Sequence, residues 1–371
     1  MGRLTEEDER PTLNIGPGVD PDDEDTAVEG RQLMPGTNVG GYLIEDMLGS
    51  GGMGVVYVGT HPLIGKRAAI KVLKPELSHD PLAVERFVTE ARAVNQIGHR
   101  NIVDIFDWGA LADGRHFYLM DLLEGESLRA RLTRTKTVHI AEAATIIDEI
   151  ASALIAAHDK GIIHRDLKPD NVFMLNVPGR WPEVRLLDWG LAKLLAPTSR
   201  YRTATGSILG TPTYMSPEQA RAAETVDART DIYALGVMSY EMLCGEVPFV
   251  RATALDTLLA HTEDPLPPLG PRVPHVPEEL VHLVEGMLAK EPYFRPALQS
   301  VQQTLKQLRG TKIPTMTAAG ISMELPPVSV GGDAVLTVDV LAKPRTITGT
   351  LAPKRASSPV VLSDSIDKKK R

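Results

Sequence analysis

The chain has 371 residues, of which 43% are apolar and 24% are charged, so it can build one large two-lobed domain with tails or two to three smaller domains. Forty basic and 48 acidic side chains give a net charge of −8, which argues against a nucleic-acid-binding protein. No apolar run approaches the ~18 residues of a membrane span, and the first ten residues lack the basic and apolar stretches of a secretory signal. We therefore expect a cytoplasmic protein with no membrane span. Its single cysteine, Cys244, has no partner for an internal disulfide.

Residues 1–41 are expected to form a disordered acidic tail. The block Asp20–Asp25 lies among Pro and Gly, and no periodicity of a helix or strand is present. Thr12 and Thr26 lie in this tail, where their phosphorylation would offer sites for phosphothreonine-binding domains. The alternative is an unmodified tail that only aids solubility.

The residue pattern changes at Tyr42, where segments typical of β-strands begin. A strand, a glycine-rich turn and a second strand are predicted over residues 42–58, and Ala68–Leu73 is a third short apolar strand. Residues 81–97 then carry helix formers with charges at i,i+3 and i,i+4 spacing. This part predicts a small β-rich lobe with one helix.

Helical signals dominate after Gly125. Residues 139–159 place a row of apolar side chains on one face, and apolar helices are predicted again near 230–243 and 277–289. Beyond Gly310 the sequence is rich in Thr, Ala, Pro, Gly and Ser and ends in a basic cluster, Lys368–Arg371. We therefore expect a larger, mainly helical lobe followed by a mostly disordered tail over residues 309–371.

The pattern Gly49-x-Gly51-x-x-Gly54 can bind phosphate, because glycines let backbone N–H groups approach phosphate oxygens without interference from a Cβ. A dinucleotide-binding turn would lead into a helix, whereas Val55–Val58 continue as a strand. That interpretation is therefore disfavoured. A plain β-hairpin turn would use the same residues, so the pattern alone leaves both alternatives open.

Lys71 lies inside the third apolar strand, where an unpaired ammonium would be costly. Glu90, on the predicted helix, is the natural anionic partner. A snorkelling surface lysine and a solvated helix glutamate are the alternative when each residue is considered by itself.

Two further motifs decide between these alternatives. Residues 162–172 place Asp166, Lys168 and Asn171 directly after an apolar strand, and Asp188 follows a second apolar run. Together with the glycine turn, Lys71 and Glu90, they form the known protein-kinase signature in the right order and spacing. The chain resembles a eukaryotic-like (Hanks-type) serine/threonine protein kinase over residues 42–308. The amino-acid sequences of residues 51–57 and 210–219 are most similar to those of the bacterial branch of this family.

The resemblance implies an α+β, two-lobed protein-kinase fold. A small lobe over residues 42–120 would hold an antiparallel β-sheet and one key helix, and a larger, mainly helical lobe would span residues 124–308. The implied activity is transfer of the γ-phosphate of ATP to Ser or Thr hydroxyls of protein substrates. The implied cofactors are ATP and Mg²⁺, with Mn²⁺ as a possible substitute.

The resemblance also assigns roles at the phosphates. Lys71, held by Glu90, would bind the α- and β-phosphates, and Asn171 and Asp188 would be the metal ligands. Asp166 would orient the substrate hydroxyl and accept its proton, Lys168 would neutralise the transferring group, and Thr211 would contact both of them. The implied nucleotide contacts are a glycine loop of Leu48, Gly49, Ser50, Gly51, Gly52, Met53 and Gly54, an adenine roof of Leu48, Val56 and Ala69, a floor of Phe173, a gatekeeper Met120, and backbone groups of Asp121 and Leu123.

Structural roles follow in the same way. Glu218 would pair with Arg295, and Asp231 would brace the catalytic loop; both are expected to be buried charges that need partners. Trp189 stands where the family has a phenylalanine, between Asp188 and Gly190. Its larger ring is expected to alter the packing against His164.

The resemblance also implies regulation by autophosphorylation, because in this family an arginine in the place of Arg165, directly before Asp166, goes with control by phosphorylation of the activation loop, here residues 191–209. A phosphate in the following loop would order that loop through charge-assisted hydrogen bonds. Thr203 and Thr205 are the expected phosphorylation sites, and autophosphorylation would involve a homodimer.

Two alternatives to an active protein kinase are open. A pseudokinase that serves as an ATP-binding scaffold is expected to lack Lys71, Asp166 or Asp188, and all three are present. A small-molecule phosphotransferase of the kinase fold is expected to lack Lys168 and the segment 210–218. Both features are present, although the Asp-Trp-Gly motif is a mild indication for that alternative.

Overall fold

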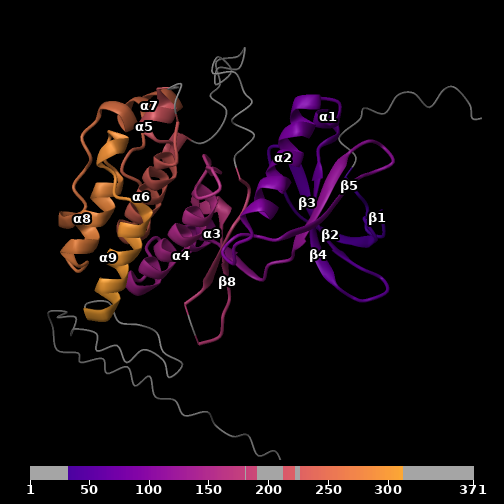
Figure 1. The fold of residues 1–371 in the computed structure, drawn as a ribbon, viewed down its shortest axis with the longest axis horizontal. Coiled ribbons are helices and arrows are strands. Elements are labelled where there is room, and N and C mark those ends of the chain that lie inside the picture. The colour runs from indigo at the N-terminus through magenta and orange to yellow at the C-terminus, as the bar shows by residue number, and fades with distance from the viewer. Residues whose placement is uncertain (1–31, 180, 190–211, 222–225, 312–371) are drawn as a thin grey trace, which may run out of the picture. The chain divides into compact units, whose positions relative to one another are not determined.

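The computed structural model describes residues 32–179, 181–189, 212–221 and 226–311 (Figure 1). Strands and one long helix make up the part before residue 122, and helices make up most of the part that follows. This division agrees with the predicted small and large lobes. Most of both predicted tails lies outside the described residues.

The small lobe is built on a six-stranded sheet in which all neighbours are antiparallel, in the order β1-β2-β3-β4-β6-β5. Side chains alternate across it: Phe117 and Leu119 join an apolar cluster on one face, whereas Tyr118 packs toward the other. The strands are β1 (Asn38–Val39), β2 (Tyr42–Ser50), β3 (Gly54–Thr60), β4 (Arg67–Leu73), β5 (Ile105–Ala110) and β6 (His116–Asp121).

Strand β1 corrects the predicted extent of the N-terminal tail. Asn38 and Val39 pair with Leu43 and Tyr42, and Val39 is fully buried. Ordered structure therefore begins before residue 42. The two-residue strand is too short to show periodicity, which is why the sequence pattern missed it.

Helix α2 (Pro81–Ile97) covers the face of the sheet that carries Tyr118 (Figure 1). Its ends follow the sequence: the Asp80 side chain accepts a hydrogen bond from Leu82 N, Pro81 occupies the first turn, and Gly98 ends the helix at φ 58°. Phe87 stacks on Tyr118 with ring centroids 4.8 Å apart. This contact fixes the face of α2 that also carries Glu90. The short helix α1 (Pro75–Ser78) precedes it.

The large lobe packs its helices around α6, which is buried along almost its whole length. At Gly236 of α6, a Cβ would lie 2.9 Å from Met287 Cβ, so only glycine allows α6 and α8 to approach so closely. Among the described residues, no helix combines the length and apolar character that a membrane span requires. The helices are α3 (Leu128–Thr135), α4 (Ile140–His158), α5 (Pro217–Ala220), α6 (Arg229–Cys244), α7 (Ala254–Glu263), α8 (Glu278–Met287) and α9 (Leu298–Thr311).

A second, three-stranded sheet links the two lobes. It consists of β7 (Gly125–Ser127), β8 (Val172–Leu175) and β9 (Glu183–Leu186). Leu186 N donates to Asn101 O at 2.8 Å and Leu186 O accepts from Val103 N at 3.1 Å, which ties β9 to the chain that enters β5. These bonds fix the position of Asp188, two residues further on.

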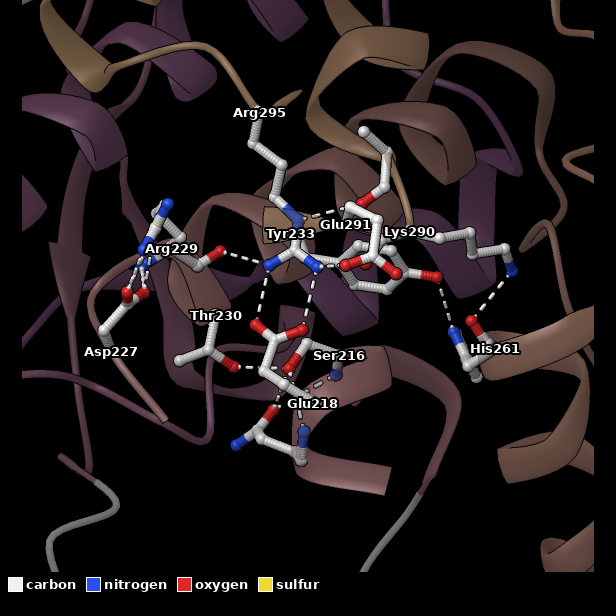
Figure 2. Close-up of polar contacts among 12 residues, drawn as sticks. Ser216, Glu218, Asp227, Arg229, Thr230, Tyr233, His261, Lys290, Glu291 and Arg295 are labelled. Carbon is white, nitrogen blue, oxygen red and sulfur yellow. Dashed lines mark hydrogen bonds and ion pairs between the residues drawn. The ribbon is translucent and has the colours of Figure 1, made fainter. Parts of the chain in front are cut away.

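A buried ion pair joins Glu218 of α5 to Arg295 in the chain before α9. Arg295 Nη1 and Nη2 donate to the Glu218 carboxylate at 2.6 and 2.8 Å, and Figure 2 shows the two groups facing each other. The other guanidinium hydrogens reach the carbonyls of Ala289, Arg229 and Lys290 at 2.8 to 3.1 Å. All five N–H donors of Arg295 are thus satisfied, and the predicted pairing is present.

Candidate active site

Lys71 of β4 lies at the centre of the site between two carboxylates. Its Nζ is 3.1 Å from Glu90 Oε1 and 2.7 Å from Asp188 Oδ1. Glu90 also accepts a hydrogen bond from the Tyr118 hydroxyl at 3.1 Å. Because Lys71 and Glu90 are both buried, the surface-lysine alternative is excluded. The predicted pair is joined by a third group, Asp188.

The charges of this cluster shift one another's pKa values. Burial alone would lower the pKa of Lys71, but Tyr118, Glu90 and Asp188 raise it well above its usual value. Burial raises the pKa of Glu90, whereas the ammonium of Lys71 lowers the pKa of Asp188, whose side chain is about half exposed. Lys71 therefore stays cationic and Asp188 anionic at neutral pH, the states that phosphate and metal binding require.

The glycine turn between β2 and β3 combines packing with open space. At Gly54 a Cβ would lie 2.7 Å from Val72 O, so this glycine is required by the fold itself. At Gly49 and Gly52 a Cβ would meet nothing within 4 Å, which leaves their backbone approachable. Gly51 N donates to Gly54 O at 2.8 Å and holds the turn. In the predicted loop of Leu48 to Gly54, Gly54 is therefore needed for packing of the hairpin, whereas Gly49 and Gly52 leave the backbone accessible to a ligand.

A pocket of about 720 Å³, measured to its open mouth, lies between the glycine turn and the chain that joins the lobes. Glu90 and Asp188 border it, so it opens onto the Lys71 cluster. All of the predicted adenine contacts line it, namely Leu48, Val56, Ala69, Met120, Asp121, Leu123 and Phe173.

The segment after α4 brings the predicted catalytic side chains together. Lys168 Nζ lies 2.9 Å from Asp166 Oδ2, and Asn171 Nδ2 donates to Asp166 O at 2.9 Å. Asn171 belongs to the 3-10 helix η1 (Pro169–Asn171), and its own carbonyl accepts from Leu187 N at 2.9 Å. That bond places Asp188 beside the segment. Both carboxylates predicted for catalysis and metal binding thus lie on adjoining chain segments.

Asp231 of α6 braces this segment as predicted. Its carboxylate accepts from His164 N at 2.9 Å and from Arg165 N at 2.8 Å, and His158 Nε2 lies 2.8 Å away. Arg165 has φ 62°, a left-handed conformation that a non-glycine residue adopts only when its surroundings hold it. The Gln219 side chain donates to Arg165 O at 2.9 Å and so holds the peptide from the other side.

Trp189 is fully buried and its ring lies 4.8 Å from that of His164, tilted by 35°. The indole therefore fits inside the core beside the catalytic segment, without displacing Asp188 from Lys71. Asp188 itself has φ 44°, the second left-handed non-glycine residue of the site. Two such residues within one site are typical of backbone held for function.

The donor set fits a magnesium ion. Asp188 offers a carboxylate, and because Asn171 Nδ2 is bonded to Asp166 O, Asn171 can offer its oxygen Oδ1. No group of three or more His, Cys, Asp or Glu side chains that could hold a metal occurs in the described part of the chain. Mg²⁺ usually binds through one or two protein oxygens and completes its shell with phosphates and water.

Five predicted site residues lie outside the described residues: Thr12, Thr26, Thr203, Thr205 and Thr211. Conversely, Tyr118 and Gln219 belong to the site but were not predicted from the sequence. The signal for Tyr118 was its place in an apolar strand, since a buried tyrosine hydroxyl usually has a partner. Gln219 gave no comparable signal, because its contact with Arg165 O joins residues 54 positions apart.

Comparison with known proteins agrees with this geometry. The family model described as "Protein kinase domain" matches residues 42–306 of this chain. The chain belongs to the protein kinase family. It is similar to the serine/threonine-protein kinase Pkn1 of Myxococcus xanthus, with 39% identity over 81% of this chain and 44% of Pkn1. It is also similar to the serine/threonine-protein kinase PknA of Mycobacterium tuberculosis, with 37% identity over 69% of this chain and 58% of PknA. The chain thus spans about half the length of these curated relatives.

A solved kinase structure shares the fold. The kinase domain of Mycobacterium tuberculosis PknI matches with a TM-score of 0.56 and 26% identity, over 75% of this chain and 99% of that domain. The predicted α+β, two-lobed kinase fold is therefore confirmed, as is the resemblance to bacterial serine/threonine kinases.

Proposed function

We propose that this kinase-family chain transfers the γ-phosphate of ATP to Ser and Thr hydroxyls of proteins. The observation that carries the proposal is the Lys71 ammonium between Glu90 and Asp188, at the mouth of the pocket and beside the segment of Asp166, Lys168 and Asn171. Lys71 would bind the α- and β-phosphates, and the apolar pocket would take the adenine. The curated relatives, named as serine/threonine-protein kinases, support the same activity.

In the proposed reaction, Asp166 accepts the proton of the substrate hydroxyl as its oxygen forms a bond to the γ-phosphorus. The bond from the γ-phosphorus to the bridging oxygen breaks, and ADP leaves. Lys168, 2.9 Å from Asp166, would neutralise the charge on the transferring group. Asn171 and Asp188 would hold Mg²⁺, which would supply further neutralisation of the phosphates. Mn²⁺ has similar ligand preferences and is a proposed substitute.

Protein hydroxyls are favoured over small-molecule acceptors by the surface beside Asp166. Asp166, Lys168, Tyr214, Met215 and Gln219 line one small pocket, so the segment after the predicted activation loop borders the catalytic carboxylate. We propose that this segment contacts the residues that flank the hydroxyl of a protein substrate.

The experiment is incubation with ATP and Mg²⁺ and with an unphosphorylated protein acceptor, followed by phosphosite mapping. We expect phosphate on Ser and Thr of the acceptor. Nucleotide binding without any transfer would favour a scaffold, and transfer to a small molecule alone would favour the phosphotransferase alternative. Either result would overturn the proposal.

We further propose that Thr203 and Thr205 are autophosphorylated between two copies of the chain. Arg165, next to Asp166, carries the positive charge that a phosphothreonine would bind. The Thr203→Ala/Thr205→Ala double variant is expected to remain folded and to lose most of its activity toward a protein acceptor. Activity assays and phosphosite mapping check this. Full activity of the double variant, or an unphosphorylated wild-type loop after incubation with ATP and Mg²⁺, would contradict it.

The acidic N-terminal segment is proposed to recruit phosphothreonine-binding domains through Thr12 and Thr26. A chain that begins at Gln32 is expected to keep its activity toward a protein acceptor and to lose capture of such a domain. Pull-down with a purified phosphothreonine-binding domain checks this. Equal capture with and without residues 1–31 means that the segment has no such role.

A further inference from the structure

Arg129 of α3 connects three parts of the large lobe that lie far apart in the sequence. Its Nη1 is 3.0 Å from Glu241 Oε1 of α6, and its Nε is 3.4 Å from Asp170 Oδ2. Its Nη2 donates to the Tyr214 hydroxyl, which in turn donates to Glu241 Oε2 at 2.5 Å. One guanidinium thus bridges two carboxylates and a phenol.

This network adjoins the catalytic segment. Asp170 belongs to η1, between Lys168 and Asn171, and Tyr214 lines the pocket that also contains Asp166 and Lys168. A substrate that brings its hydroxyl to Asp166 must therefore pass close to Arg129. The side chain of Arg129 is 34% exposed and that of Asp170 is 50% exposed, whereas that of Glu241 is only 10% exposed. The network is open toward the solvent on the side of Asp170.

The charges in this network do not cancel. Two carboxylates face one guanidinium, so the group has a net charge of about −1 and would have −2 without Arg129. Burial of Tyr214 and its contact with Glu241 raise the pKa of the phenol, so that Tyr214 stays neutral. Since charge-assisted hydrogen bonds to carboxylates are strong, these carboxylates would form a binding site for any cation that replaced Arg129.

We propose that Arg129 determines substrate specificity by filling an acidic subsite that would otherwise bind a Lys or Arg side chain of the substrate. This inference rests on the proposed protein kinase activity. With Arg129 in place, a basic substrate residue finds Glu241 and Asp170 already paired. Without Arg129, the two carboxylates select for such a residue.

The test uses a set of synthetic serine peptides with neutral flanks, each carrying one Arg at a different position near the serine. The wild type is expected to have similar kcat/KM values for the neutral and the Arg-containing peptides. Arg129→Ala and Arg129→Gln are expected to raise the ratio of Arg-containing to neutral peptide by about tenfold at one or more positions, as a new charge-assisted contact does. Arg129→Gln keeps most of the side-chain volume and so guards against a folding defect in Arg129→Ala.

Two further variants separate charge from structure. Arg134→Ala removes an exposed arginine of the same helix, paired with Glu126, and is expected to keep the wild-type ratio. Adding Glu241→Gln to Arg129→Gln is expected to reduce the gained preference. An equal fall in rate on all peptides would mean that Arg129 only positions Tyr214, and would overturn the inference. So would an unchanged ratio in both Arg129 variants while the wild type phosphorylates the peptides. No phosphorylation of any peptide by the wild type would overturn the proposed function and the inference together.

Discussion

Asp166→Asn is expected to lower the rate of phosphoryl transfer by ~10²–10⁴, which is roughly 3–5 kcal/mol of barrier. An amide cannot accept the proton of the substrate hydroxyl, although it retains an oxygen that Lys168 can bond. Asp166 does not line the pocket that would hold the adenine, and the residues fitted for the metal are Asn171 and Asp188. Nucleotide affinity is therefore expected to stay within a few fold of the wild type.

The measurement is kcat on a protein acceptor together with the dissociation constant of the nucleotide. Asp159→Asn, at the exposed C-terminal end of α4, is the matched control and is expected to change neither quantity. Lys71→Met is expected to give the complementary result, weaker nucleotide binding, because it removes the proposed phosphate contact. An Asp166→Asn variant that transfers phosphate at nearly the wild-type rate would remove Asp166 from its proposed role.

Arg295→Ala is expected to lower the free energy of unfolding by about 3–5 kcal/mol, because it leaves the Glu218 carboxylate buried without its partner. The Arg295 side chain is fully buried and that of Glu218 is 9% exposed. Three backbone carbonyls lose their donor as well. Arg295→Lys is expected to be almost as damaging, since three donors on a flexible stem cannot replace five in a planar fork.

Urea unfolding of the full chain measures this effect. Arg272→Ala removes an exposed arginine paired with Glu246 and is expected to cost less than about 1 kcal/mol. The double variant Glu218→Gln/Arg295→Met is expected to be less destabilised than the sum of its single variants, because no uncompensated charge remains. A midpoint for Arg295→Ala equal to that of Arg272→Ala would show that the buried pair is not needed for stability.

Sequence reasoning anticipated those parts of the site whose residue types are dictated by local chemistry. Lys71 lies inside an apolar strand, so an anionic partner was predicted for it, and Glu90 on helix α2 is that partner. The apolar run before Asp188 forms strand β9, as predicted. The strand predicted before Asp166 is wrong, because residues 162–164 form irregular chain in which only His164 is buried. The glycine spacing was less decisive, since Gly54 proves to serve the packing of the hairpin while Gly49 and Gly52 leave backbone accessible.

Contacts that depend on tertiary structure could not be predicted in the same way. Arg129 and Glu241 are 112 residues apart and read separately as ordinary charges on helix surfaces. Only the packing of α3 and α6 around the 3-10 helix η4 (Pro212–Tyr214) brings them to one phenol. The left-handed conformation of Arg165 likewise needs Asp231 and Gln219 to hold it, and no local pattern encodes it.

The most direct test of the central claim is mass-spectrometric mapping of phosphosites on the wild type and on Asp166→Asn, after incubation of each with ATP, Mg²⁺ and one protein acceptor. The account predicts phosphoserine and phosphothreonine on the acceptor with the wild type and nearly none with the variant, at equal nucleotide occupancy. Equal phosphorylation by both proteins, or none by a nucleotide-bound wild type, would contradict it.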